Sequence, residues 1–420
     1  MPAPLEIASY HCVDVRFGPA GSFRNGILEL ERERLRELAR DEPPIVDVEI
    51  TLVRPGDPVR LVNVLDVVEP TVKIDRPEAT FPGSLGFDTK AGVGRTNRVD
   101  GLAIISMADF GPTRNATLLK DLPLAVIDMS GPAAPYSPWS KTRNVVVAYS
   151  FAAGASLEAA ARTARRATLR IAQEIAEATR GAMPDDSLVL DDGTAEASDD
   201  LPAICVVLQL GAEGAVYDTF LYGQPINELE PRVLAPSEVL DGALVNQAFN
   251  WAAVRNPTYV YQRSRLLLAL SGMHGKTLRF AGVVVGISYL ESALDKERVA
   301  RLAAEAAASL GADGAIVATF SSGYSHADAM LTCRACEAAG VRTAIIVAET
   351  DSGLFDHVEE ADCIVSVGNI DEPAPQWQPE AIVAPPGSAA ASELPSRLSI
   401  ASYVGAAVQT GDAQLTMVPA

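Results

Sequence analysis

The sequence has few of the residues that carry redox and metal chemistry. Its 420 residues include five cysteines and four histidines, and their spacing matches no metal site. An odd number of scattered cysteines indicates reduced thiols rather than a disulfide framework. Cys333 and Cys336 have the spacing of a redox motif, but they fall inside a predicted helix, away from the exposed helix start that stabilises a thiolate. We therefore expect structural thiols and no metal.

Positive charge is also scarce. The chain has 34 basic and 54 acidic residues, which gives a formal net charge of −20. Such a surface repels phosphate backbones and anionic lipids, so we expect neither nucleic acid nor a membrane as a partner. No apolar run approaches the roughly 20 residues of a membrane span, and the N-terminus lacks the basic and apolar regions of a signal peptide. These absences predict a cytoplasmic protein.

The chain does have ample material for a core, because 48% of its residues are apolar. Its length favours two domains. Strand-rich patterns and one long amphipathic helix predict an N-terminal mixed α/β domain over residues 1–190. Regular alternation of strands and helices predicts a C-terminal Rossmann-like α/β domain, with a doubly wound and mainly parallel sheet, over residues 200–385. An acidic, turn-rich segment at 182–200 separates them, and we expect little order in the tail, residues 386–420.

The individual elements are read from hydrophobic periodicity and from Gly and Pro punctuation. Short apolar or β-branched runs predict strands, and longer amphipathic runs predict helices. Strands are expected at 45–53, 59–68, 124–131, 144–151, 203–210, 278–288, 311–320, 342–349 and 362–369, and helices at 156–181, 294–311 and 325–340.

Two loops in the N-terminal part combine a Gly- or Pro-defined backbone with cationic and hydroxyl side chains. They are "GVGRTNR" (92–98) and the loop within 127–144. Backbone N–H groups and fixed cations in such loops can bind a small anion. The alternative is that Gly and Pro simply shape the loops. The candidate substrate-binding residues here are Arg95, Thr96, Ser130, Tyr136, Ser140 and Lys141.

A third loop, "FSSGYSHAD" (320–328), lies between a predicted strand and a predicted helix. Ligands of open parallel sheets bind at the carboxyl ends of strands, so Ser322 and His326 are candidates for binding a carboxylate or phosphate. The alternative is that Ser325 caps the helix and His326 lies on the surface. The loop contains no GxGxxG or Walker pattern, so a nucleotide is not indicated.

Several of these stretches resemble one family. "GVGRTN", "VIDMSGPAAPYSPWSKTRNV", "PSEVLDGALV", "HGKTLRFAGVVV" and "CRACEAAGVRTAII" occur in the order found in the proprotein subunit of component B of the glycine, sarcosine and betaine reductases. The D-proline reductase proprotein is a more distant relative. The resemblance extends over roughly residues 10–370, and the long, unusual stretch beginning "VIDMSGP" makes chance similarity improbable.

The resemblance implies an anaerobic enzyme that reductively cleaves a C–N bond next to a carboxylate. Family proproteins cut themselves at an internal Cys and keep a pyruvoyl group, while a partner subunit carrying Cys or selenocysteine attacks the α-carbon. In this chain the position of that Cys falls at Ala253, and a methyl group supplies no nucleophile. Between Asn246 and Gln262 the one candidate nucleophile is Thr258. We therefore expect no pyruvoyl cofactor and no processing, although the loop itself remains.

The same loop offers aromatic side chains that could hold an amine without a covalent bond. Phe249, Trp251, Tyr259 and Tyr261 are of the types that attract quaternary ammonium groups through cation–π contacts, and Asn256 adds a polar candidate. The alternative is that these aromatics pack a core or an interface. We expect this loop and the one at 321–326 to face the same cavity, because both belong to the ligand-binding edge of the predicted sheet.

Three functions remain open at this point. The chain is an unprocessed component-B-like subunit that binds a small amine or carboxylate for reductive C–N cleavage with a thiol or selenol partner, or a non-catalytic scaffold or binding subunit. The third possibility is a non-reductive enzyme that uses the same pocket. In each case we expect a hetero- or homo-oligomer, because the chain has no exposed redox group of its own.

The absence of a cysteine at position 253 leads to the first prediction. The purified protein should appear in intact mass spectrometry as one species with the mass of the whole 420-residue chain. Two fragments separated near Ala253, the second with a blocked N-terminus, would contradict the expected loss of self-cleavage.

Overall fold

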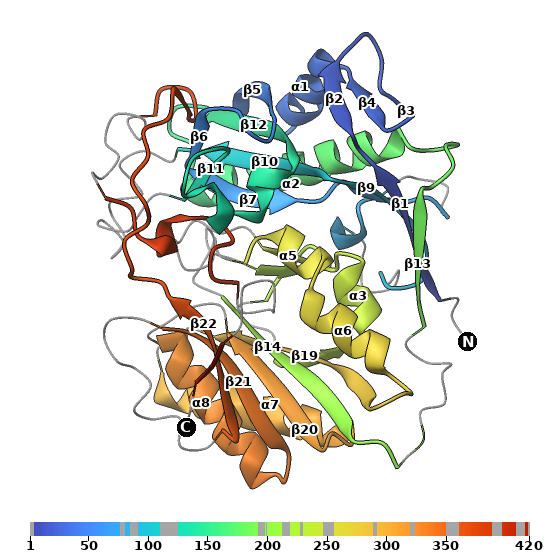
Figure 1. Ribbon diagram of the computed structural model, residues 1–420, viewed down its shortest axis with the longest axis vertical. Helices are drawn as coiled ribbons and strands as arrows, with labels where there is room; N and C mark the ends of the chain where they lie inside the picture. Colours follow the sequence, from blue (N-terminus) through green and yellow to red (C-terminus); the bar gives the residue numbers. More distant parts are fainter. Residues whose placement is uncertain are drawn as a thin grey trace.

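The computed structural model describes residues 4–75, 80–84, 91–109, 125–191, 198, 200–211, 219–226, 230–246, 256–288, 292–319, 324–349, 361–388, 397–408 and 416–418. The architecture is mixed α/β, with several small sheets in the N-terminal half and one large sheet in the C-terminal half (Figure 1). Within the described ranges no helix has the length and apolar character needed to cross a membrane.

Two four-stranded sheets form the centre of the N-terminal half. The first has the order β13 (Asp186–Leu190), β1 (Leu5–His11), β9 (Gly94–Asp100), β8 (Thr71–Lys73). The second has the order β5 (Ile45–Val53), β12 (Arg143–Phe151), β10 (Leu102–Ala108), β7 (Val64–Val68).

Strand β10 shows how the second sheet is covered on both faces. Every residue of "LAIISMA" is buried. Because side chains alternate along a strand, Leu102 and Ile104 enter one hydrophobic cluster, while Ile105 and Met107 enter another on the opposite face. The first cluster includes one face of α2 (Leu157–Glu177), which Ser156 caps by accepting a hydrogen bond from the amide of Ala159.

Two smaller sheets and one more helix complete this half. They are β2 (Asp14–Phe17), β4 (Ile27–Leu30) and β3 (Ser22–Arg24) in one sheet, β11 (Val126–Asp128), β6 (Val59–Val62) and β23 (Ala381–Val383) in the other, and helix α1 (Arg32–Arg40). Short 3-10 turns lie at Pro82–Ser84, Ala134–Tyr136 and Pro138–Lys141.

The predicted strand 59–68 is two strands in different sheets. Asn63 has a φ of +63°, a left-handed conformation that Asn tolerates better than most residues. The chain therefore turns at Asn63, leaving β6 in one sheet and β7 in another. The predicted helix 156–181 is confirmed but ends at Glu177, four residues before Gly181, whose φ is +82°.

The C-terminal half is built on a seven-stranded sheet. Five consecutive strands run parallel, and an antiparallel strand closes each edge. The order is β17 (Arg232–Leu234), β19 (Arg279–Ser288), β14 (Ala203–Gly211), β20 (Gly314–Thr319), β21 (Arg342–Glu349), β22 (Cys363–Asn369), β24 (Thr416–Val418). The strands predicted in this half and its two predicted helices, α7 (Ala293–Ser309) and α8 (Tyr324–Ala338), are confirmed.

Helices cover both faces of β14. Its alternate residues Cys205 and Val207 pack in a cluster with α7 and α8, whereas Val206 and Leu208 pack with α3 (Pro236–Leu240) and α6 (Arg265–Met273). Figure 1 shows α3, α6 and α5 (Thr258–Gln262) between the upper sheets and the lower sheet. A small sheet has the order β16 (Gln224–Pro225), β15 (Thr219–Leu221), β18 (Leu244–Asn246), and its Leu221 and Leu244 belong to the same hydrophobic cluster as α3 and α6.

The predicted boundary segment and the predicted tail both contain regular structure. Within the acidic segment 182–200, β13 pairs with β1. Beyond Pro385, a 3-10 turn at Ile400–Ser402 leads to Tyr403 and Val404, which are buried, and β24 pairs with β22. The prediction of a poorly ordered tail is wrong for these residues, because a few apolar side chains in an Ala- and Ser-rich stretch suffice to dock it.

A buried ion pair joins the N-terminal sheet to α3. The ammonium of Lys73 lies 2.7 Å from a carboxylate oxygen of Asp241, and both side chains are fully buried. Asp241 also accepts hydrogen bonds from the Thr96 hydroxyl, at 2.5 Å, and from the amide of Gly92, at 2.7 Å. Lys73 in turn donates to the carbonyl of Val93. The "GVGRT" loop is thus fastened to the "LDG" turn by one carboxylate.

This ion pair leads to a stability prediction. Asp241→Ala should lower the free energy of unfolding by about 3–5 kcal/mol, because it leaves the buried charge of Lys73 without a partner. The double variant Lys73→Met, Asp241→Leu should recover part of that loss, since both charges are then absent. Denaturant unfolding followed by circular dichroism measures both. If the double variant is as unstable as the single one, the hydrogen bonds to Thr96 and Gly92 matter more than the charge pair.

Candidate functional site

The two ends of the segment 247–255 lie side by side. The amide of Asn246, at the end of β18, donates to the Thr258 hydroxyl at 2.9 Å, and the Asn246 side chain donates to the carbonyl of Asn256 at 2.6 Å. All three residues are buried. The segment between them, which includes Trp251 and Ala253, lies outside the described residues. Asn246 and Asn256, the described residues on either side of this segment, therefore meet at one buried point.

Asp66 on β7 binds Thr258 at the place where the two ends meet. One carboxylate oxygen accepts the backbone amides of Thr258 and Val67, at 2.9 and 2.8 Å, and the other lies 2.6 Å from the Thr258 hydroxyl, which donates to it. Asp66 is 4% exposed. Burial raises the pKa of its carboxyl to about 8, and the hydrogen bonds from Thr258 only partly offset this. No basic side chain is among its partners in the described part of the chain.

This geometry does not fit the formation of a pyruvoyl group from Thr258. Its hydroxyl donates to Asp66, accepts from the amide of Asn246, and is fully buried. A nucleophile for self-cleavage must instead be free to attack a neighbouring carbonyl. Thr258 therefore serves as a structural clamp that holds the two ends of the segment together.

Asn256 is the residue at this point whose side-chain amide is unpaired among the described residues. Its side chain is 1% exposed, and neither the amide nitrogen nor the amide oxygen has a hydrogen-bond partner within the described residues. Burying an amide unpaired is costly, so buried polar groups nearly always have partners. An amide in this state offers one acceptor and two N–H donors to a ligand.

The same point is linked to the carboxyl end of the large parallel sheet. The Thr219 hydroxyl lies 3.1 Å from the carbonyl of Gly211, the last residue of β14, and 3.4 Å from the side-chain oxygen of Asn246. His326 is buried on the first turn of α8, so the alternative of a surface histidine is wrong. Ser322 lies outside the described residues. Whether His326 binds a ligand stays a prediction.

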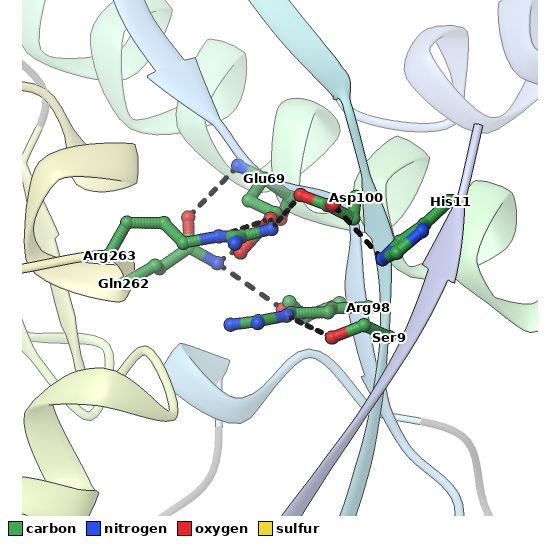
Figure 2. Close-up of polar contacts among 8 residues, drawn as sticks. Ser9, His11, Glu69, Arg98, Asp100, Gln262 and Arg263 are labelled. Atoms are coloured by element: carbon green, nitrogen blue, oxygen red, sulfur yellow. Dashed lines mark hydrogen bonds and ion pairs between the residues drawn. The ribbon is translucent and has the colours of Figure 1, made fainter. Parts of the chain in front are cut away.

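A charged cluster lies at the other end of α5 (Figure 2). Arg263 donates through Nε to Glu69 at 2.7 Å and through Nη2 to Asp100 at 2.5 Å. Burial opposes the charge on Arg263, but the carboxylates, Glu69 foremost, raise the pKa of its guanidinium above the usual value. Gln262, the residue before Arg263, also contacts Glu69, because its side-chain oxygen accepts a hydrogen bond from the backbone amide of Glu69 at 2.9 Å.

Arg98 lies beside Arg263 in this cluster (Figure 2). Its Nε donates to the Ser9 hydroxyl at 2.8 Å, and His11 lies 3.4 Å from Asp100. Burial lowers the pKa of Arg98 despite the nearby carboxylates. Sequence reasoning missed Glu69, Arg98 and Arg263 as site residues. The one available signal was that Arg98 ends the "GVGRTNR" motif.

The predicted anion-binding residues do not come together. Thr96 is bound to Asp241, whereas Arg95, on the opposite face of β9, lies 3.9 Å from Glu6. In the second loop Tyr136 is half-buried, with its ring 5.8 Å from that of Tyr403. Of the remaining candidates, Ser140 is buried, Ser130 is half-buried and Lys141 is exposed.

The aromatic residues of α5 point into different clusters. Tyr261 is 1% exposed and belongs to the hydrophobic cluster that β14 forms with α3 and α6. Tyr259 belongs to a different cluster, in which it packs edge-on against Trp139 with ring centroids 5.8 Å apart. The two tyrosines therefore cannot face one cation together, which favours packing as their role. Burial also raises the pKa of both hydroxyls above the usual value.

The cysteines have the environment of structural thiols. Cys333 and Cys336 are fully buried in α8, and burial raises the pKa of the Cys336 thiol to about 11. Burial likewise raises the pKa of Cys12 to about 11 and that of Cys205 to about 12. A reactive thiolate requires the opposite shift. All four thiols are buried, as expected for structural cysteines.

Comparison with known proteins identifies a set of relatives. Residues 3–387 match the family described as glycine/sarcosine/betaine reductase component B subunits. The chain is 31% identical over 376 residues to "Glycine reductase complex component B subunits alpha and beta" of Acetoanaerobium sticklandii, covering 87% of this chain and 85% of the relative. It is 28% and 29% identical to the alpha subunits of sarcosine and betaine reductase complex component B of Peptoclostridium acidaminophilum, again with 85% of each relative covered. No solved structure matched.

The raised pKa of Asp66 leads to a prediction about pH. The folded-state value of about 8 lies above the unfolded value of about 3.9, so this group stabilises the fold at low pH and loses that contribution as pH rises through about 8. Asp66→Asn keeps the shape and does not titrate. The melting temperature of this variant relative to wild type should increase between pH 5 and 8 and then level off.

Thr258→Val is the matched control for this experiment. It removes one hydrogen bond from Asp66 without removing the titrating group, so it should lower the melting temperature and stay dependent on pH. Because the Thr258 hydroxyl lowers the pKa of Asp66, the dependence of this variant should extend to higher pH than that of the wild type. A constant difference between Asp66→Asn and wild type across this range would contradict the assignment.

Proposed function

The chain belongs to the family of glycine/sarcosine/betaine reductase component B subunits, and from this we propose that it is an unprocessed subunit of such a reductase-type complex. In the proposed role it binds a small amino-acid-derived amine and presents its C–N bond to a thiol or selenol of a partner subunit. One observation supports this role most directly: the side-chain amide of Asn256 is buried where the two ends of segment 247–255 meet, and it has no partner among the residues that the structure describes.

The chemistry of Asn256 matches both ends of such a substrate. Its amide oxygen can accept an N–H from an ammonium group, and its amide nitrogen can donate to a carboxylate. The surrounding network fixes the position of this residue, because Asn246 holds its carbonyl and Asp66 holds Thr258 two residues later. A substrate held in this way needs no covalent link to the protein.

The cleavage step in this proposal balances without an added oxidant or reductant. A partner thiolate or selenolate attacks the α-carbon and forms an S–C or Se–C bond as the C–N bond breaks. The electron pair of the C–N bond leaves with nitrogen, so a primary ammonium departs as ammonia and a quaternary ammonium as a tertiary amine. Positioning and exclusion of water are the contributions that this chain can make to such a displacement.

The nucleophile in this proposal comes from a partner because the thiols of this chain are unsuited to the task. Four of its five cysteines are buried, and burial raises the pKa of three of them. The relatives are named as components of reductase complexes, which supports a partner subunit for this chain.

The arrangement of the C-terminal sheet is consistent with this site. We propose a Rossmann-like, doubly wound unit over residues 200–385, apart from β23, which pairs with β6, and an N-terminal unit over residues 1–190. In such folds ligands bind beyond the carboxyl ends of the parallel strands. Gly211 ends β14 and is linked through Thr219 to Asn246, so His326 and Ser322 are proposed as further contacts on that side.

A second candidate is a non-catalytic binding subunit. The absence of any nucleophile at position 253 and the buried state of Thr258 favour it over a self-sufficient enzyme. It would bind the same amine but support no cleavage when a partner is added. Ammonia release in the presence of the partner subunit therefore distinguishes the two candidates.

The role of Asn256 leads to the next prediction. Asn256→Leu should reduce the affinity for glycine or betaine at least tenfold, while the melting temperature stays equal or rises, because an unpaired buried amide has been removed. Isothermal titration calorimetry and thermal unfolding give the two readouts.

Asn97→Leu is the matched control. Asn97 is also a buried asparagine, but its amide donates to the Thr179 hydroxyl at 2.9 Å. This variant should lose stability and keep its affinity. If Asn256→Leu instead destabilises the protein and leaves amine affinity unchanged, Asn256 has a structural role and the proposed site is wrong.

A further inference from the structure

A separate cavity lies where the C-terminal segment of the chain returns to the N-terminal sheets. Its volume is about 260 Å³, and its lining includes Arg60, Gln376, Trp377, Gln378 and Tyr403. Strand β23 pairs with β6 beside it, and Figure 1 shows this orange-red part of the chain running along β6 and β11. None of these residues takes part in the site at Asn256.

Arg60 is the charged group in the cavity wall. It lies on β6 and is 7% exposed. Its Nε and Nη2 atoms donate to the two carboxylate oxygens of Asp128, at 2.6 and 2.8 Å, and Asp128 is fully buried. Tyr403 donates to the same carboxylate at 2.9 Å. These contacts occupy one edge of the guanidinium and hold the side chain in a single orientation.

The other edge of the guanidinium is not used by any residue that the structure describes. Among the described residues nothing accepts a hydrogen bond from Nη1, and Nη2 reaches only the Tyr403 hydroxyl at 3.4 Å besides Asp128. A guanidinium has five N–H donors in a rigid fork, and a second carboxylate can bind end-on while the first is bound side-on. Because Arg60 lines the cavity, Nη1 is the donor that the cavity offers.

Trp377 forms a fixed wall next to this donor. Its ring lies 5.8 Å from Cζ of Arg60, a cation–π arrangement. It also packs directly on Gly131, where an added Cβ would lie 2.6 Å from the ring, so only glycine permits this contact. Gly131 has a φ of +83° in the loop that follows Asp128. Asp128, which binds Arg60, and Gly131, which contacts the Trp377 ring, are therefore close together in the sequence, and this short stretch positions both side chains.

We propose that this cavity is a carboxylate-binding site, in which the free edge of Arg60 holds one carboxylate group against Trp377. The carboxylate belongs either to a free small acid or to the carboxyl terminus of a polypeptide. Because Asp128 already balances the charge of Arg60, we expect modest affinity, with a dissociation constant on the order of 1 mM for a small acid. This site is independent of the proposed function, and either can be wrong while the other holds.

The first experiment titrates the full-length protein with acetate, followed by ligand-observed NMR. Saturable binding should be weakened at least tenfold by Arg60→Lys, because an ammonium held by Asp128 has no second edge for the ligand. Trp377→Leu should weaken it as well, and it leaves the Arg60–Asp128 pair in place if Arg60→Lys fails to fold. Arg16→Lys, which changes an exposed arginine paired with Glu29, should bind acetate as the wild type does.

The second experiment identifies the source of the carboxylate. An N-acetylated dipeptide with a free carboxyl terminus is titrated in the same way, with its C-terminally amidated form as control. Tighter binding of the free peptide than of acetate, by tenfold or more, assigns the site to a polypeptide terminus, and equal or weaker binding assigns it to a free acid. Absence of saturation with both probes, or equal affinity in wild type, Arg60→Lys and Trp377→Leu, overturns the proposal.

Discussion

The arrangement around Asp66 is the constraint on which the proposed functional site depends. This single carboxyl group, buried on β7 of an N-terminal sheet, binds both the backbone and the hydroxyl of Thr258. Thr258 in turn holds Asn246, so one carboxyl closes a loop whose ends are 10 residues apart in the sequence. Burial raises the pKa of this carboxyl to about 8, and among the described residues no basic side chain contacts it to offset the shift.

The short helix α5 is bound at both of its ends to the N-terminal part of the chain. The N-terminal end of α5 is tied to Asp66, and just beyond its C-terminal end Arg263 is bound to Glu69 and Asp100 (Figure 2). Glu69 follows Asp66 closely on the same N-terminal segment, so both ends of the helix are fastened to one stretch of chain. On the other side, Thr219 links the loop to β14. A ligand near Asn256 would therefore contact a rigid frame.

Local patterns in the sequence predicted the elements well, because each depends on nearby residues. The strands at 45–53 and 342–349 and helices α7 and α8 follow from apolar runs, alternation and capping. The turn at Asn63 was missed, since nothing in "VRLVNVLDVV" except one asparagine interrupts the pattern. The docking of Tyr403 was missed as well, because its partner Asp128 is 275 residues away.

The candidate site was less predictable for the same reason. Asn256 came from the sequence as a candidate, but its lack of a partner is visible only in three dimensions. Arg95 and Arg98 are the same residue type in the same motif, so the sequence does not distinguish them. They lie on opposite faces of β9, and as a result Arg98 lies beside Arg263 whereas Arg95 lies near Glu6. Thr96 has the residue type of an anion-binding group, yet it serves to hold Asp241.

The central claim is that this chain holds an amine without a carbonyl group. Incubation with glycine and sodium borohydride, followed by intact mass spectrometry, tests it most directly, provided that calorimetry on the same sample shows reversible binding of glycine. We predict saturable binding with no increase in mass, because no Schiff base can form. A mass increase equal to one reduced glycine adduct would contradict the absence of a carbonyl, and a lack of any binding would contradict the amine site itself.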